Sequence, residues 1–136
     1  MSTVPAAERV LSFGEAERFV KRVEAVFRTM ELESIVELFA SSAVVRFPFA
    51  APIAGRAAIE AFLRARYADI SDYSLSKELV AVHGCRLAVK LRAQWRSAAT
   101  GARVESIAME VLTVERSRIA EWEAVSVSQP RPVEAP

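Results

Sequence analysis

The spacing of apolar residues divides the chain into a helical half and a half built of strands. A helix is predicted over about residues 13–29, because apolar side chains recur there every three or four positions, at Phe19, Val20, Val23, Phe27 and Met30. Ser12 and Glu15 precede this run at the spacing of a capping box. The helix is therefore expected to begin directly after Ser12.

Two further helices are predicted before the strands begin. The segment Glu31–Ser34 interrupts the first pattern and starts a shorter helix, whose apolar face comprises Ile35, Leu38 and Phe39. Residues 43–47 then form a predicted strand that Pro48 ends. A third helix follows Gly55 over residues 56–67, and its inward face carries Ile59, Phe62, Leu63 and Tyr67.

After Asp72 the period of the apolar pattern falls from about 3.6 to 2, which indicates a sheet. Four long strands are predicted, over residues 73–82, 86–95, 104–115 and 118–128. Turn signals separate them at His83–Gly84, Thr100–Gly101 and Arg116–Ser117. Three helices followed by four antiparallel strands predict an α+β fold, in which a curved sheet wraps around the helices and leaves room for a cavity.

The predicted domain covers residues 13–128, after an N-terminal extension over residues 1–12. The end of the chain, residues 129–136, is rich in proline and is predicted to be a disordered tail. A length of 136 residues suits one domain with a core of its own. No internal repeat is visible.

Charge and cysteine content exclude several classes of function. The net charge of +1 gives no field that would attract nucleic acid or an anionic membrane, so neither is an expected partner. The single cysteine, Cys85, excludes an internal disulfide and suits a reducing cytoplasm. No run approaches the roughly 18 apolar residues of a membrane span. One histidine, His83, makes no metal site, so we expect a cytoplasmic protein without a metal or other cofactor.

Two segments resemble a known superfamily. LFASSAVVRFPFAAPIAGRAAIEAFL and ERSRIAEWEAVSVS are similar to the SnoaL-like and ketosteroid-isomerase-like branches of the nuclear transport factor 2-like superfamily, and the resemblance spans about residues 13–128. It implies a cone-shaped, curved antiparallel sheet wrapped around three N-terminal helices, a cystatin-like α+β barrel. It also implies a mouth that admits a small apolar metabolite, and a homodimer formed through the outer face of the sheet.

The resemblance implies catalytic positions that this chain fills only in part. The general-base aspartate of ketosteroid isomerases corresponds to Phe47, the donor tyrosine to Val23 and the third acidic group to Glu110. Isomerisation of the steroid type is disfavoured, because abstraction of a proton needs a positioned base. SnoaL-like polyketide cyclases use an acid and base pair, for which only Glu110 is available here.

The epoxide-hydrolase branch is similar at GARVESIAMEVLTVE, and it uses an arginine between two aspartates. Arg92 and Gln94 occupy the first arginine and aspartate positions, and the second aspartate corresponds to Ala124. The alternation of the strand also turns Arg92 and Gln94 away from the core. That catalytic triad is incomplete.

Glu110 is the predicted catalytic residue. On its own face of the strand it is flanked by Ala108 and Leu112, so its carboxyl group is expected among apolar neighbours. Burial without a cation would favour the neutral form and make it an acid or a weak base. The alternatives are a buried ion pair with Arg46 or a solvated strand residue. The predicted ligand-binding residues are Phe27, Phe47, Phe49, Tyr67, Trp95, Trp122, Ala124 and Ser126.

Two classes of function remain open. The first is a cofactor-independent isomerase, cyclase or hydrolase that acts on an apolar, oxygenated metabolite. The second is a non-catalytic module for ligand binding or dimerisation, whose cone either holds a hydrophobic molecule or is filled by Phe47, Trp95 and Trp122. A cavity of about 300 Å³ or more, lined by Glu110 without a cationic partner, would favour the enzyme.

Overall fold

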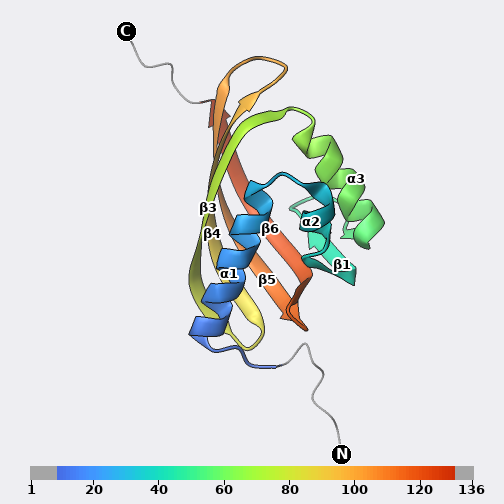
Figure 1. Cartoon of the computed structure of the whole chain (residues 1–136), viewed down its shortest axis with the longest axis vertical. Helices are drawn as coiled ribbons and strands as arrows, with labels where there is room; N and C mark the ends of the chain where they lie inside the picture. Colours follow the sequence, from blue (N-terminus) through green and yellow to red (C-terminus); the bar gives the residue numbers. More distant parts are fainter. Residues whose placement is uncertain (1–8, 131–136) are drawn as a thin grey trace, which may run out of the picture.

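The structure, a computed structural model that describes residues 9–130, has the predicted α+β architecture. The helices are α1 (Phe13–Arg28), α2 (Leu32–Val36) and α3 (Arg56–Tyr67). The strands are β1 (Phe39–Arg46), β2 (Ile53–Ala54), β3 (Ile70–His83), β4 (Arg86–Ser97), β5 (Arg103–Glu115) and β6 (Arg118–Pro130). Figure 1 shows all three helices on one side of a curved sheet.

One six-stranded sheet carries the whole fold, in the order β2-β1-β6-β5-β4-β3. The predicted antiparallel meander is confirmed, because β3, β4, β5 and β6 pair in sequence. β1 adds a parallel pairing with β6, and β2 pairs antiparallel with β1. The sheet is therefore mixed, with two more strands than the meander.

The start of α1 follows the predicted capping box. Ser12 Oγ accepts from the Glu15 backbone N–H at 3.1 Å, and the Ser12 N–H donates to Glu15 Oε1 at 3.0 Å. These bonds from Ser12 hold the pKa of Glu15 below its usual value. The buried face of the helix then carries Phe19, Val20, Val23 and Phe27, as the periodicity predicts.

The prediction that Phe39 lies on the second helix is wrong. α2 ends at Val36, and β1 begins at Phe39. The Ile119 N–H donates to the Leu38 carbonyl at 2.8 Å, and Arg56 donates to the Phe39 carbonyl at 2.9 and 2.7 Å. These partners come from distant parts of the chain, so tertiary contacts override the local helical pattern here.

The last hairpin turns where the sequence predicts. Arg116 and Ser117 both have positive φ, 51° and 63°, which is the backbone of a tight two-residue turn. β6 then extends to Pro130, which lies opposite Val104 on β5. Residues 129–130 therefore belong to the sheet and not to the predicted tail. The remainder of that tail, 131–136, and residues 1–8 of the predicted extension lie outside the described residues.

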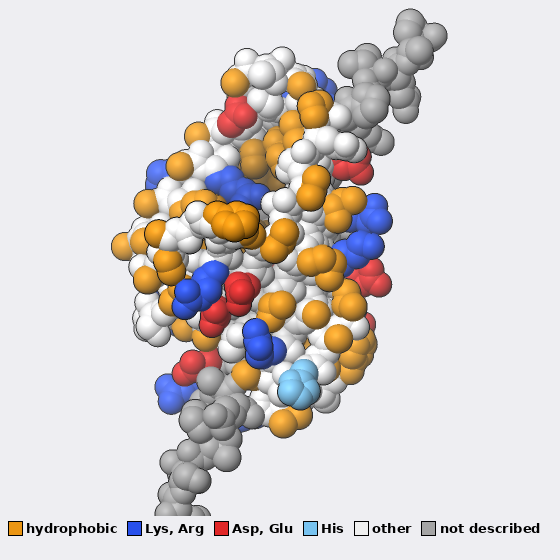
Figure 2. Space-filling model, turned by 180° about the vertical axis from the view of Figure 1, so that it is seen from behind, with side chains coloured by type: hydrophobic (Ala, Val, Ile, Leu, Met, Phe, Trp, Pro, Cys, Tyr) orange, Lys and Arg blue, Asp and Glu red, His pale blue; other side chains and the backbone are white. Residues whose placement is uncertain are grey.

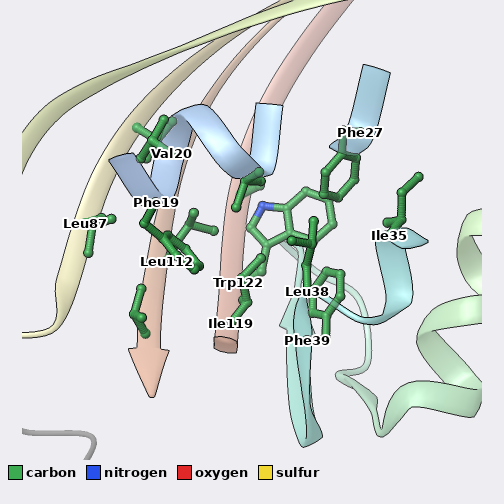
Figure 3. Close-up of a cluster of buried hydrophobic side chains, with 14 of the residues drawn as sticks. Phe19, Val20, Phe27, Ile35, Leu38, Phe39, Leu87, Leu112, Ile119 and Trp122 are labelled. Atoms are coloured by element: carbon green, nitrogen blue, oxygen red, sulfur yellow. The ribbon is translucent and has the colours of Figure 1, made fainter. Parts of the chain in front are cut away.

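The core lies between the helices and the concave face of the sheet. Trp122 on β6 is at its centre, with ring centroids 6.1 Å from Phe27, 6.2 Å from Phe39 and 5.8 Å from Phe47. Figure 3 shows Trp122 beside Phe27, Leu38, Phe39 and Ile119. Side chains of α1, β1 and β6 thus interlock around one indole ring.

Candidate functional site

Glu110 lies on the concave face of β5 with its carboxyl group completely buried. Its Oε1 is 2.6 Å from Lys77 Nζ, and its Oε2 accepts a hydrogen bond from Trp122 Nε1 at 2.8 Å. Of the alternatives for this carboxyl, the structure has a buried ion pair, but its partner is Lys77. Arg46 instead pairs with Glu121, at 2.9 Å.

Lys77 is the functional candidate that sequence reasoning missed. It lies on β3 between Leu75 and Leu79, both buried, and its own side chain is 4% exposed. A lysine within an otherwise apolar inward row was the signal that could have revealed it, since lysine is almost never buried without a partner. Its backbone N–H donates to Glu24 Oε2 at 2.6 Å, which fixes β3 against α1.

The cavity beside this ion pair is small, about 30 Å³. It is lined by Phe27, Leu63, Arg66, Tyr67, Tyr73, Leu75, Lys77, Leu91, Glu110 and Trp122. A water molecule needs at least about 10–15 Å³ of such space, so there is room for one or two waters. The cone holds about a tenth of the 300 Å³ expected of an open ligand pocket, because aromatic rings fill it.

Two tyrosines form the more exposed side of the cavity. The rings of Tyr67 and Tyr73 lie 6.0 Å apart, and Tyr73 lies 6.4 Å from Trp95. Burial raises the pKa of both tyrosine hydroxyls, so both stay protonated at neutral pH. Within residues 9–130 neither hydroxyl has a hydrogen-bond partner. Both are free to bond a ligand.

Three of the predicted ligand-binding residues line this cavity together with Glu110: Phe27, Tyr67 and Trp122. Phe47 lies beside them and packs against Phe62, with ring centroids 5.3 Å apart. Trp95 is half-buried next to Tyr73.

The other three predicted residues lie elsewhere. Phe49 is fully exposed in the turn after β1, with φ of 60°, so it contributes no wall to the cone. Ser126 is exposed on β6. Ala124 is buried, and it lines a separate groove.

That groove lies on the convex side of the sheet, beneath the loop between β1 and β2. Its volume is about 490 Å³, and its lining includes Phe47, Pro48, Pro52, Met109, Glu110, Val111, Glu123 and Val125. The side chain of Glu110 is nevertheless completely buried on the other face of the sheet. The segment RFPFAAPIAGR therefore borders the outer face of the sheet, in addition to placing Phe47 in the core.

Neither a metal centre nor a membrane helix is evident between residues 9 and 130. No three histidine, cysteine or acidic side chains of that range gather closely enough to hold a metal ion. None of its helices combines the length and apolar character needed to cross a bilayer.

A model of the SnoaL-like domain family matches residues 17–122. Among solved structures, a Bacillus subtilis protein provisionally named an isomerase has a TM-score of 0.70 at 20% identity, over 85% of this chain and 88% of that one. An LEH-like epoxide hydrolase from M. tuberculosis has a TM-score of 0.67 at 15% identity, over 82% of this chain and 81% of that one. SalBIII, an epoxide hydrolase/cyclase-like enzyme of pyran ring formation in salinomycin, has a TM-score of 0.66 at 19% identity, over 82% of this chain and 87% of that one. No curated protein matches the sequence significantly.

Proposed function

The chain belongs to the SnoaL-like domain family and has the nuclear transport factor 2-like, ketosteroid-isomerase-like fold, and from this premise we propose that its cone binds a small, largely apolar metabolite that carries oxygen. The observation that carries the proposal is the buried group of Lys77, Glu110 and Trp122 beside an aromatic-lined cavity. Polar groups that converge in an apolar cleft are typical of binding sites.

The chemistry that suits this site is a proton transfer without a cofactor. An isomerase, cyclase or hydrolase of this kind needs a donor or acceptor held in a dry site. Lys77 and Glu110 supply one of each. Two of the similar structures are named as an epoxide hydrolase and an epoxide hydrolase/cyclase-like enzyme, and an epoxide is an oxygenated group. Glu110, the residue predicted from the sequence, is one candidate for this transfer, and Lys77 is the other.

A specific observation favours a second candidate function, the non-catalytic module. The cavity measures only about 30 Å³, and each oxygen of Glu110 already accepts from a donor. A ligand larger than a few atoms therefore has to displace the rings of Tyr67 and Tyr73. If those rings do not move, the cone is only a packed core.

If the proposed function is correct, the cone binds a ligand. In a panel of terpenoid, steroid and polyketide-like compounds, at least one should shift the NMR signals of Tyr67, Tyr73 and Trp122. Tyr67→Phe and Tyr73→Phe should each lower the affinity for that compound roughly 2–10-fold, which corresponds to the loss of one hydrogen bond. Phe49→Ala is the control and should change nothing, because Phe49 is fully exposed and outside the cavity lining.

Two outcomes decide between the candidates. If no compound shifts the cone signals of the folded protein, the cone is a packed core and the non-catalytic module is the better description. If a compound binds and is converted, turnover that survives Glu110→Gln removes Glu110 from the chemistry.

We also propose that the convex face of the sheet packs against a second copy of this chain. Five large apolar side chains are between 41% and 72% exposed there: Val80, Ile107, Met109, Val125 and Val127. Figure 2, seen from behind the view of Figure 1, shows hydrophobic side chains spread over this face among charged ones. An apolar area of this kind on a sheet marks a contact surface.

Charge on the two strands beside β5 is self-complementary. Arg86 and Lys90 lie on β4, and Glu121 and Glu123 lie on β6. Arg86 and Glu121 both lie opposite Thr113 on β5. A twofold axis along β5 would place β4 of one copy over β6 of the other, and Arg86 of each copy would then approach Glu121 of the other.

Met109→Asp is expected to convert this dimer to a monomer. A charge buried without a partner in the interface costs several kcal/mol, so the dissociation constant should rise roughly 100-fold or more. Light scattering at micromolar concentration measures the change, with the exposed Val10→Asp as the control. A monomeric wild-type protein under the same conditions would refute the dimer.

A further inference from the structure

Lys77 is held at two points, which fixes where its ammonium group lies. Its backbone N–H donates to Glu24 Oε2 on α1 at 2.6 Å, and Nζ donates to Glu110 Oε1 on β5 at 2.6 Å. Glu24 in turn pairs with Arg28, at 3.4 Å. The lysine side chain therefore spans the core in one defined direction, and Nζ lies 5.5 Å from the centre of the Phe27 ring.

The unused hydrogen-bonding capacity of the cavity belongs mainly to donors. An ammonium group has three N–H donors, and within residues 9–130 only Glu110 accepts from Nζ. Both oxygens of Glu110 already face a donor, one from Lys77 and one from Trp122. The hydroxyls of Tyr67 and Tyr73 are free to donate as well. A ligand that completes this set must supply an acceptor.

Charge restricts the ligand further. The Lys77 and Glu110 charges cancel each other, and Glu24 is paired with Arg28. Arg66, an exposed residue that lines the cavity, adds a positive charge on its outer side. Neutral or anionic oxygen acceptors suit such a site, and amines do not.

We propose that Lys77, and not Glu110, contacts the ligand, and that the ligand is a planar apolar carbonyl compound whose oxygen accepts from Nζ. This inference rests on the proposed binding of a metabolite in the cone. Because the cavity measures only about 30 Å³, the rings of Tyr67 and Tyr73 have to move outward, and the ring of the ligand then lies between them and Phe27. Negative charge that develops on the carbonyl oxygen is stabilised by the ammonium group. Glu110 is then a positioning residue that holds Lys77 in place.

Acetophenone and α-methylstyrene are a matched pair of probes, because they differ only in C=O against C=CH₂. The wild-type protein should bind acetophenone about tenfold or more tightly, since a hydrogen bond to a charged group is stronger than a neutral one. The infrared stretch of ¹³C=O-labelled acetophenone should also move to lower frequency on binding. A lysine with a purely structural role would produce neither effect.

The variant Lys77→Met/Glu110→Gln tests the lysine without leaving a buried charge unpaired. Its cooperative unfolding is checked first, and Lys77→Arg serves as a second variant that keeps the charge. In the double variant the preference for acetophenone should fall to about one, with α-methylstyrene affinity unchanged and the C=O shift lost. Lys77→Arg should keep a preference for acetophenone, because a charged donor remains beside Glu110.

Each remaining outcome has one meaning. Equal binding of the two probes by the wild-type protein overturns the role of Lys77 and leaves binding in the cone intact. A preference that survives in the double variant also overturns it, because another group is then responsible. If neither probe binds, this ligand class is excluded, and the wider panel described above decides whether the cone binds anything.

Discussion

Lys77→Met is expected to lower the free energy of unfolding by about 3–5 kcal/mol, because it leaves the Glu110 carboxylate buried without its cation. Trp122 Nε1 alone would then face the carboxylate, and a single neutral donor does not replace an ammonium group. Urea unfolding followed by tryptophan fluorescence measures the loss.

The matched control is an ion pair at the surface. Arg64 and Glu60 are 2.8 Å apart on α3, but their side chains are 67% and 38% exposed. Arg64→Met should cost less than about 1 kcal/mol, since water screens such pairs. The double variant Lys77→Met/Glu110→Gln should recover most of the loss, because no buried charge remains. If the free energy of unfolding of Lys77→Met alone stays within about 1 kcal/mol of the wild-type value, Glu110 does not depend on Lys77 as its buried counter-charge.

Phe39→Ala should lower the free energy of unfolding by about 3–5 kcal/mol, the usual cost of emptying a phenylalanine site in a core. Phe39 has no exposed surface, and its ring lies 6.2 Å from that of Trp122. It also begins β1, so its loss weakens the parallel pairing with β6. The measurement is again a urea titration.

Phe49→Ala supplies the comparison within the same segment of the chain. Phe49 is fully exposed, so its removal should change the free energy of unfolding by less than about 0.5 kcal/mol. Similar losses for the two variants would contradict the placement of either ring.

Local pattern predicted most of the fold because helices and hairpins depend on neighbours in sequence. The predicted third helix, residues 56–67, has the bounds of α3, and the turns of the meander lie where glycine and polar residues indicate them. The strand predicted over residues 43–47 is the second half of β1, but the early start of β1 at Phe39 and its pairing were not predicted. Its parallel partner β6 lies some 80 residues further along the chain, and no local signal identifies such a pairing.

For a similar reason, only one partner of the buried ion pair in the candidate site could be predicted. Strand alternation placed Glu110 on the concave face of the sheet, where the structure has it. Alternation says nothing of what lies opposite, and Lys77 is 33 residues away on a strand that does not pair with β5. Phe49 shows the same limit, because its positive φ turns the ring outward and periodicity does not reveal it.

The bonds from α1 to β3 also bear on how the protein avoids association through its sheet edge. β3 is the last strand of the sheet, so its outward backbone groups have no strand to pair with. Glu24 accepts from the Lys77 N–H, and Arg28 donates to the Leu75 carbonyl at 3.1 Å. Two side chains of one helix thus occupy two of the outward groups in the middle of this edge, where an incoming strand would pair. Detachment of α1 would free these two groups, so the packing of α1 also protects the middle of this edge from pairing with a strand of another molecule.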